Sequence, residues 1–215
     1  MKRSILLALA FAAASITASA VNVTYSTAVN WNCNGVAGCA VNGNDLTIND
    51  LIIRYTFNSA TVNAPSAPGF TGANFGELLA LCVGGGDCTN LTDISGALIT
   101  VTISQTVPFV QSAQFTGVLG GQISNTQSLS PALVTFNPLS ASVTDGVSLT
   151  VNYFLQQPSN PVNGYILNSI NDNSPTSLQG AINTESVPEP STVALIGLGL
   201  LAVGLRGRKS DIDPR

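Results

Sequence analysis

The clearest structural signal in this chain is the run Leu98-Ile99-Thr100-Val101-Thr102-Ile103-Ser104. Its apolar residues alternate with hydroxyl residues, so Ile99, Val101 and Ile103 share one face. Successive side chains of a β-strand point to opposite sides of its sheet, and this period of two predicts a half-buried strand. β-branched residues favour the same backbone conformation.

The same alternation recurs in 147–156, where Ser148, Thr150 and Asn152 oppose an apolar face, and in 51–57. Further candidate strands are Val21 to Trp31, Phe109 to Leu119, Ala132 to Asn137, Gly164 to Asn168 and Ser177 to Thr184.

Turn residues separate these runs at short intervals, and Asp145-Gly146 before an alternating run predicts a β-hairpin. Only Phe75 to Leu81 has the pattern of a short helical turn. Many short strands with such turns predict an all-β fold, a single β-sandwich of jelly-roll or immunoglobulin-like kind over residues 21–186.

The N-terminus has the order of a secretory signal peptide. Lys2 and Arg3 precede an apolar run from Ile5 to Ala14, and Ala18-Ser19-Ala20 follows as a small-residue cleavage site. We therefore expect residues 1–20 to be removed by signal peptidase, leaving a mature chain that begins near Val21. The alternative is an uncleaved anchor, but the apolar run is shorter than the about 20 residues that a span needs.

The C-terminus contains a second apolar segment, Ser191 to Leu205, flanked by Val187-Pro188-Glu189-Pro190 and by a basic cluster of Arg206, Arg208 and Lys209. As a helix, its about 15 residues cover roughly 22 Å of a hydrocarbon core about 30 Å thick. The sequence predicts a short transmembrane helix. Its basic cluster stops transfer on the cytoplasmic side, so that the preceding domain faces outward.

The order of Pro188-Glu189-Pro190, apolar run and basic cluster resembles the PEP-CTERM sorting signal of Gram-negative bacteria. The resemblance covers residues 187–209, and the short tail 210–215 departs from the family, whose members usually end soon after the basic cluster. It implies transient insertion in the inner membrane, removal of the signal by an exosortase, and delivery to the cell surface or outside the cell. The alternative is an ordinary tail anchor that follows a Pro-Glu-Pro.

Charge is scarce in the domain between the two signals. Charged residues make up 8% of the chain, and Arg54 is the only basic residue between Val21 and Val187. Nucleic acid is excluded as a partner, because a phosphate-binding surface needs several Lys or Arg residues. A surface polar through Asn, Thr, Ser and Gln suits neutral polymers, other surface proteins or a hydrated matrix.

Four cysteines in an exported chain are expected to be oxidised. Cys33 and Cys39 enclose the same number of residues as Cys82 and Cys88, and both intervals contain glycines. Local pairing, Cys33–Cys39 and Cys82–Cys88, is favoured among the three possible connectivities. A metal site is the alternative, but this spacing without any histidine is poor for zinc.

Catalytic candidates are few. The chain has no histidine, the usual general base near neutral pH and a common metal ligand. Asp45 and Asp50 are close in sequence and could form a carboxylate pair for glycoside hydrolysis. They lie in a turn-rich stretch where Asp ordinarily caps turns, and we expect the protein to have no catalytic residues and no cofactor.

Two oxygen-rich clusters could hold calcium: Asn42, Asn44 and Asp45, and Asn171, Asp172 and Asn173. Neither matches an EF-hand, and Asn and Asp are also ordinary turn residues, so we expect no metal site.

Carbohydrate binding would need an exposed aromatic residue beside amides. Trp31, between Asn30 and Asn32, is the best candidate, with Tyr153 and Tyr165 as lesser ones. Trp31 could equally pack in the core against the neighbouring cysteine.

The sequence thus predicts a non-enzymatic exported protein of the cell surface or biofilm matrix, with a structural or adhesive role and an association with exopolysaccharide. A carbohydrate-binding module centred on Trp31 is the first alternative, and a secreted hydrolase is the second.

Overall fold

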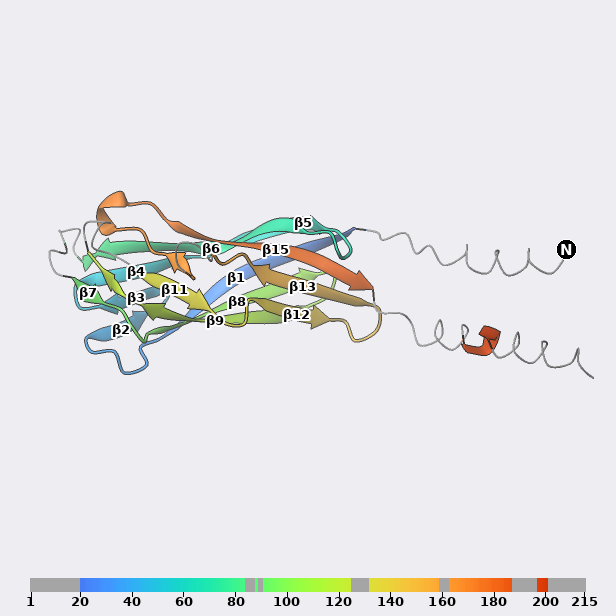
Figure 1. Cartoon of the computed structure of the whole chain (residues 1–215), viewed down its shortest axis with the longest axis horizontal. Helices are drawn as coiled ribbons and strands as arrows, with labels where there is room; N and C mark the ends of the chain where they lie inside the picture. Colours follow the sequence, from blue (N-terminus) through green and yellow to red (C-terminus); the bar gives the residue numbers. More distant parts are fainter. Residues whose placement is uncertain are drawn as a thin grey trace, which may run out of the picture.

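The computed structural model describes residues 20–83, 88, 91–124, 132–158, 163–186 and 197–200. Within these residues the chain forms an elongated sandwich of antiparallel strands, which confirms the predicted all-β fold (Figure 1). In chain order the elements are β1 (Val21–Asn32), β2 (Cys39–Asn42), β3 (Asp45–Ile48), β4 (Leu51–Thr56), β5 (Ser59–Ala64), β6 (Thr71–Cys82), β7 (Thr92–Asp93), β8 (Leu98–Val107), β9 (Gln111–Gly120), β10 (Gln122–Ile123), β11 (Leu133–Phe136), β12 (Ser140–Thr144), β13 (Leu149–Leu155), β14 (Tyr165–Ile166), the 3-10 helix η3 (Ile170–Asp172) and β15 (Thr176–Ser186).

The described strands form two large sheets, with β7 and β10 paired separately as a short ribbon. Sheet A has the order β14-β11-β9-β8-β1-β5, and sheet B has the order β12-β13-β15-β6-β4-β3-β2. One continuous apolar core includes residues from both sheets. The inward side chains of each strand meet in this core and alternate with outward polar ones, which is the usual solution for two stacked sheets.

Four aromatic rings form the centre of the core. Tyr25 and Phe115 come from sheet A, and Phe75 and Tyr153 come from sheet B. The centroid of Phe75 lies 5.8 Å from Tyr25, 6.1 Å from Phe115 and 6.1 Å from Tyr153. These rings are fully buried, and each contributes on the order of 2–3 kcal/mol through removal of its apolar surface from water.

Tyrosine hydroxyl groups fix the two sheets relative to each other. The hydroxyl of Tyr153 in sheet B donates to Oε1 of Gln105 in sheet A at 2.6 Å. Gln105 is buried and donates in turn to the carbonyl of Phe109 at 3.0 Å. The hydroxyl of Tyr25 in sheet A donates to the carbonyl of Asn74 in sheet B at 3.0 Å, so the second bond runs in the other direction. Since buried polar groups need partners, these bonds favour one alignment of the sheets.

Most predicted strands are present, with differences at their ends. The run from Leu98 to Ser104 lies in β8, and the side chains of Ile99, Val101 and Ile103 are buried as predicted. The alternation predicts a buried Phe57, but this residue follows β4 and its side chain is 64% exposed. The alternation also assigns Asn152 to the polar face, yet it is buried and donates to Oδ1 of Asn183.

The prediction of a helical turn at Phe75 to Leu81 is wrong. This segment belongs to β6, which pairs with β4 on one side and β15 on the other. Gly76 has a φ of +117° within the strand, and the pairing of β15 with β6 shifts register between Ser177 and Gln179. The pairing on both sides overrides the helix propensity of Leu, Ala and Glu, as tertiary context commonly does.

The sandwich has two distinct ends. At the distal end, Cys39, Ile48, Leu51 and Cys82 lie in register across four strands of sheet B. At the proximal end, β1 begins and β15 finishes (Figure 1). The proximal end therefore carries both connections to the terminal segments of the chain.

Candidate functional site

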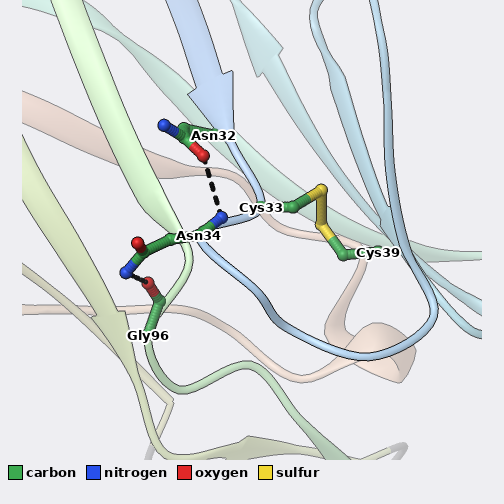
Figure 2. Close-up of a disulfide and its surroundings, with 5 residues drawn as sticks. All are labelled: Asn32, Cys33, Asn34, Cys39 and Gly96. Atoms are coloured by element: carbon green, nitrogen blue, oxygen red, sulfur yellow. Dashed lines mark hydrogen bonds between the residues drawn. A yellow bond between two sulfur atoms is a disulfide. The ribbon is translucent and has the colours of Figure 1, made fainter.

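The first disulfide joins the two sheets at the distal end. Cys33 directly follows β1 of sheet A, and Cys39 begins β2 of sheet B. Figure 2 shows that the intervening loop is also held by Asn34. The backbone N–H of Asn34 donates to Oδ1 of Asn32 at 2.8 Å, and its side-chain amide donates to the carbonyl of Gly96 at 3.0 Å. This closure holds the loop against the strand that follows Gly96.

The second disulfide pairs Cys82, the last residue of β6, with Cys88. Both bridges have the local connectivity that the sequence spacing favours. Because Cys39 and Cys82 share one register level, the distal end of sheet B is closed by covalent bonds on two of its strands. Each bridge restricts the unfolded chain and so stabilises the fold, by about 2 kcal/mol for rings this small in the loop-entropy account.

The prediction of an exposed Trp31 patch is wrong. The Trp31 side chain is only 4% exposed and belongs to the core. Its indole N–H donates across the sandwich to the carbonyl of Asn44 at 2.9 Å. Tyr153 and Tyr165 are also buried, so none of the three rings is available to stack on a sugar. The core role that the sequence left open for Trp31 is the one the structure has.

Asp45 and Asp50 do not form a catalytic pair in this fold. Asp45 begins β3 and Asp50 lies in the turn after Ile48, so the length of β3, about 10 Å for three residue steps of about 3.3 Å each, separates Asp45 from that turn. The Asp45 carboxylate accepts two hydrogen bonds from the guanidinium of Arg54, both at 2.9 Å. That bidentate pair raises the pKa of Arg54 above its ordinary value through hydrogen bonding and charge. The single arginine of the domain is therefore paired.

The two oxygen-rich clusters do not gather carboxylates. In the first, Asp45 is engaged by Arg54, and the carbonyl of Asn44 accepts from Trp31 and from the backbone N–H of Tyr55. In the second, Asp172 and Asn173 are exposed at the end of η3. Within the described ranges, no three His, Cys, Asp or Glu side chains are close enough together to hold a metal ion.

The buried phenols do not provide acid–base groups near neutral pH. Burial raises the pKa of Tyr55 to about 12. Burial likewise raises the pKa values of Tyr153 and Tyr165 above the ordinary tyrosine value. Their hydroxyl groups therefore stay protonated and act as hydrogen-bond donors within the sandwich.

At the proximal end, the β12–β13 hairpin has a tightly ordered tip. One carboxylate oxygen of Asp145 accepts hydrogen bonds from the backbone N–H groups of Val147, Ser148 and Leu149, with N···O distances of 2.9, 2.8 and 3.0 Å. Gly146, with a φ of +79°, supplies the left-handed backbone that the turn requires. Val147 is displayed at this tip with 64% of its side chain exposed.

We expect Asp145→Asn to flatten the acid dependence of stability. The three backbone donors hold the pKa of Asp145 well below its ordinary value, so the carboxylate stabilises the fold above the unfolded pKa of about 3.9. That contribution is lost as pH falls below about 4 toward the folded pKa. The measurement is the urea unfolding midpoint at pH 5 and at pH 2.5, and the variant should lose less stability between these two pH values than the wild-type protein.

Asp50→Asn is the control for this prediction, because the Asp50 side chain caps no turn of this kind in the described part of the chain. This variant measures what the loss of one negative charge by itself does to the two unfolding midpoints. An Asp145→Asn protein that loses as much stability in acid as wild type would contradict the assigned role of the Asp145 carboxylate.

The last strand leads directly into the sorting segment. β15 lies between β13 and β6 in the interior of sheet B and ends at Ser186, where it pairs with Leu149. Residues 186–209 match the sequence profile of the PEP-CTERM protein-sorting motif. The chain carries a PEP-CTERM sorting motif. It is therefore an exported protein that an exosortase processes. The PEP-CTERM match begins at the final residue of the folded sandwich.

The remaining comparisons add no relative of this protein. Neither the search of curated proteins nor the search of solved structures found a match. The match to the motif covers the C-terminal segment alone, so it identifies the sorting route and leaves the role of the sandwich to its own chemistry.

Both terminal signals fall largely outside the described residues. The signal peptide predicted for residues 1–20 and the motif residues Pro188, Glu189, Pro190, Arg206, Arg208 and Lys209 are in undescribed parts of the chain. Of the predicted membrane helix, the structure describes residues 197–200, which are helical. Among the described residues, no helix has both the length and the apolar character to cross a membrane.

Two exposed residues at or near the proximal end are not distinguished by the sequence patterns. Phe70 lies in the loop before β6 and is exposed. Its ring packs edge-on against that of Phe154, with 5.3 Å between the two ring centroids. The alternation predicts Val147 in a strand, but it occupies the hairpin tip. The Asp145-Gly146 signal could have identified the tip, but no local pattern distinguishes the exposed Phe70 from a core phenylalanine.

Proposed function

We propose that this PEP-CTERM protein is a non-enzymatic structural or adhesive component of the cell surface or extracellular matrix, associated with neutral exopolysaccharide. The observation that carries the proposal is the surface of the sandwich. Its only basic residue is paired with Asp45, so its polarity comes from amides and hydroxyls. Such a surface presents many weak hydrogen-bonding groups and little charge, which suits contact with an uncharged hydrated polymer.

The architecture supports the same proposal. The core is closed by cross-sheet tyrosine bonds and the distal end by two disulfides, a construction suited to an oxidising extracellular space. Because the motif follows β15 without an intervening linker, removal of the motif would leave the whole sandwich as the delivered unit.

Phe70 is the residue that we propose contacts the polymer. With Trp31 buried, the exposed ring of Phe70, which lies edge-on against the half-buried ring of Phe154, is an aromatic surface that a sugar ring could cover. Phe57 is similarly exposed but makes no ring contact with another described aromatic residue, so it serves as a matched comparison.

The test is cosedimentation of the chain recovered from its host with the neutral exopolysaccharide of that host. We expect binding that changes less than about twofold between 0.1 and 1 M NaCl, because charge makes little contribution. Phe70→Ala should weaken binding by about fivefold, the effect of about 1 kcal/mol of lost contact, while Phe57→Ala should not. Absence of binding, or binding abolished by salt, would contradict the proposal.

A further inference from the structure

We propose that the tip of the β12–β13 hairpin, with Val147 at its apex, is a second contact surface for the exosortase that processes the motif. This inference goes beyond the structural role proposed above and does not depend on it. It rests on exosortase processing and on the position of the hairpin beside the end of β15.

The sandwich and the motif are separated by a short length of chain. Ser186 is fixed in sheet B, and Val187 is the only residue between it and Pro188. Two residue steps span at most about 7 Å, and the four steps to Pro190 span at most about 14 Å. An enzyme that encloses Pro188 to Pro190 in a cleft must therefore contact the proximal end of the folded domain.

The β12–β13 hairpin lies directly beside the end of β15. Leu149 is the partner of Ser186, so the hairpin residues 145–148 lie next to the last residue of that strand (Figure 1). On the other side of β15, the loop before β6 bonds to Thr184, whose N–H donates to the carbonyl of Pro65 at 2.9 Å. This loop is fixed to a residue before the strand end, whereas the base of the hairpin pairs with Ser186 itself. The last described residue before the motif therefore lies beside the hairpin.

The hairpin tip presents an exposed apolar side chain on an ordered backbone. Val147 is 64% exposed, and the three bonds to Asp145 order the backbone around it. A pre-ordered apolar side chain loses little conformational entropy when a partner covers it. Arg54, the only basic residue of the domain, lies on β4 opposite Leu79, away from this end. A protein surface is therefore favoured over anionic lipid headgroups, which attract basic clusters.

The test measures the rate at which the full chain loses its motif, by pulse-chase in a host that contains the exosortase. Val147→Asp should slow processing by about five- to tenfold, the scale of one partly buried apolar contact. Val41→Asp is the matched control, since Val41 is an exposed valine on the edge strand β2. It should be processed at the wild-type rate. Equal rates for both variants would overturn the inference.

A second variant tests the same contact without substituting Val147. Insertion of Gly-Ser-Gly-Ser after Ser186 moves Pro188, Glu189 and Pro190 away from the hairpin and leaves the sequence of both the hairpin and residues 187–209 unchanged. We expect slower processing of the inserted chain, and we expect that adding Val147→Asp to this chain slows it no further. Faster or unchanged processing on insertion would show that the enzyme reads the motif alone and would overturn the inference.

A photo-crosslinking residue placed at position 147 identifies the partner directly. An adduct with the exosortase, absent when the residue is placed at position 41, is the expected result. An adduct with lipid, or no adduct, would overturn the inference. Failure of the proposed function is separate, because it would appear as a processed chain that does not bind exopolysaccharide.

Discussion

Gly180→Ala is expected to destabilise the sandwich by about 3 kcal/mol or more, the upper range for overpacking a core. A Cβ atom at Gly180 would overlap the ring of Phe75 and the backbone carbonyl oxygen of Phe154. Phe75 is held among three other buried rings, and the Phe154 carbonyl belongs to the adjacent strand of sheet B. Neither neighbour can move without loss of core packing or of strand pairing.

Gly72→Ala is the matched control for that substitution. Gly72 lies on β6 opposite Ala181, one residue from the level of Gly180, and a Cβ atom there would meet no atom within 4 Å. Alanine at this site should be neutral or stabilise by up to about 1 kcal/mol, because it restricts the unfolded chain. Urea unfolding of the oxidised proteins compares the two, and equal midpoints would show that Phe75 and the Phe154 carbonyl are not tightly packed around Gly180.

Replacement of Pro188, Glu189 and Pro190 by alanine should reduce processing by at least about tenfold, the effect of about 1.4 kcal/mol of lost transition-state binding. The two prolines restrict their own backbone and that of the preceding residue toward extended conformations, which suit a peptide entering a protease cleft. The variant should accumulate as an uncut chain in the membrane fraction, measured by immunoblot and mass. It should fold normally, since the triple change lies outside the sandwich.

Asp213→Asn is the control, because Asp213 lies in the tail beyond the matched motif. It should leave processing unchanged. If the triple-alanine chain were cut at the wild-type rate, the Pro-Glu-Pro segment would not be the determinant of sorting in this protein.

The sequence was most informative where a local pattern dictates the structure. Alternation predicts β8 and the buried faces of Ile99 and Val101, because a strand with one face in the core imposes a period of two. Asp145-Gly146 predicts its hairpin for a similarly local reason: the carboxylate caps the turn that the glycine permits. The PEP-CTERM motif was also recognisable, since it is linear and needs no tertiary structure.

Residues whose roles depend on distant partners were not predictable. Trp31 resembles a surface aromatic between two amides, but the carbonyl of Asn44, in the turn between β2 and β3, supplies its partner. Asp45 resembles half of a carboxylate pair until the register of β3 and β4 places Arg54 opposite it. The helix formers of Phe75 to Leu81 adopt a strand because two neighbouring strands pair with them. Each outcome is decided by topology.

The position of the hairpin beside the sorting motif is also a product of topology. Val147 and Ser186 are far apart in sequence, and only the pairing of Leu149 with Ser186 brings them to the same end of sheet B. No periodicity or spacing in the chain encodes this neighbourhood. The structure was therefore needed to connect the folded domain with the processing of its motif.

Delivery of the sandwich by exosortase processing is tested by intact-mass measurement and C-terminal peptide mapping. The protein is recovered for this purpose from the surface, matrix and inner-membrane fractions of its host. We predict a chain that begins near Val21, ends near Pro190 and is found in the surface or matrix fraction. A chain that retains residues 197–200 and stays in the inner-membrane fraction would contradict delivery of the sandwich through its PEP-CTERM motif.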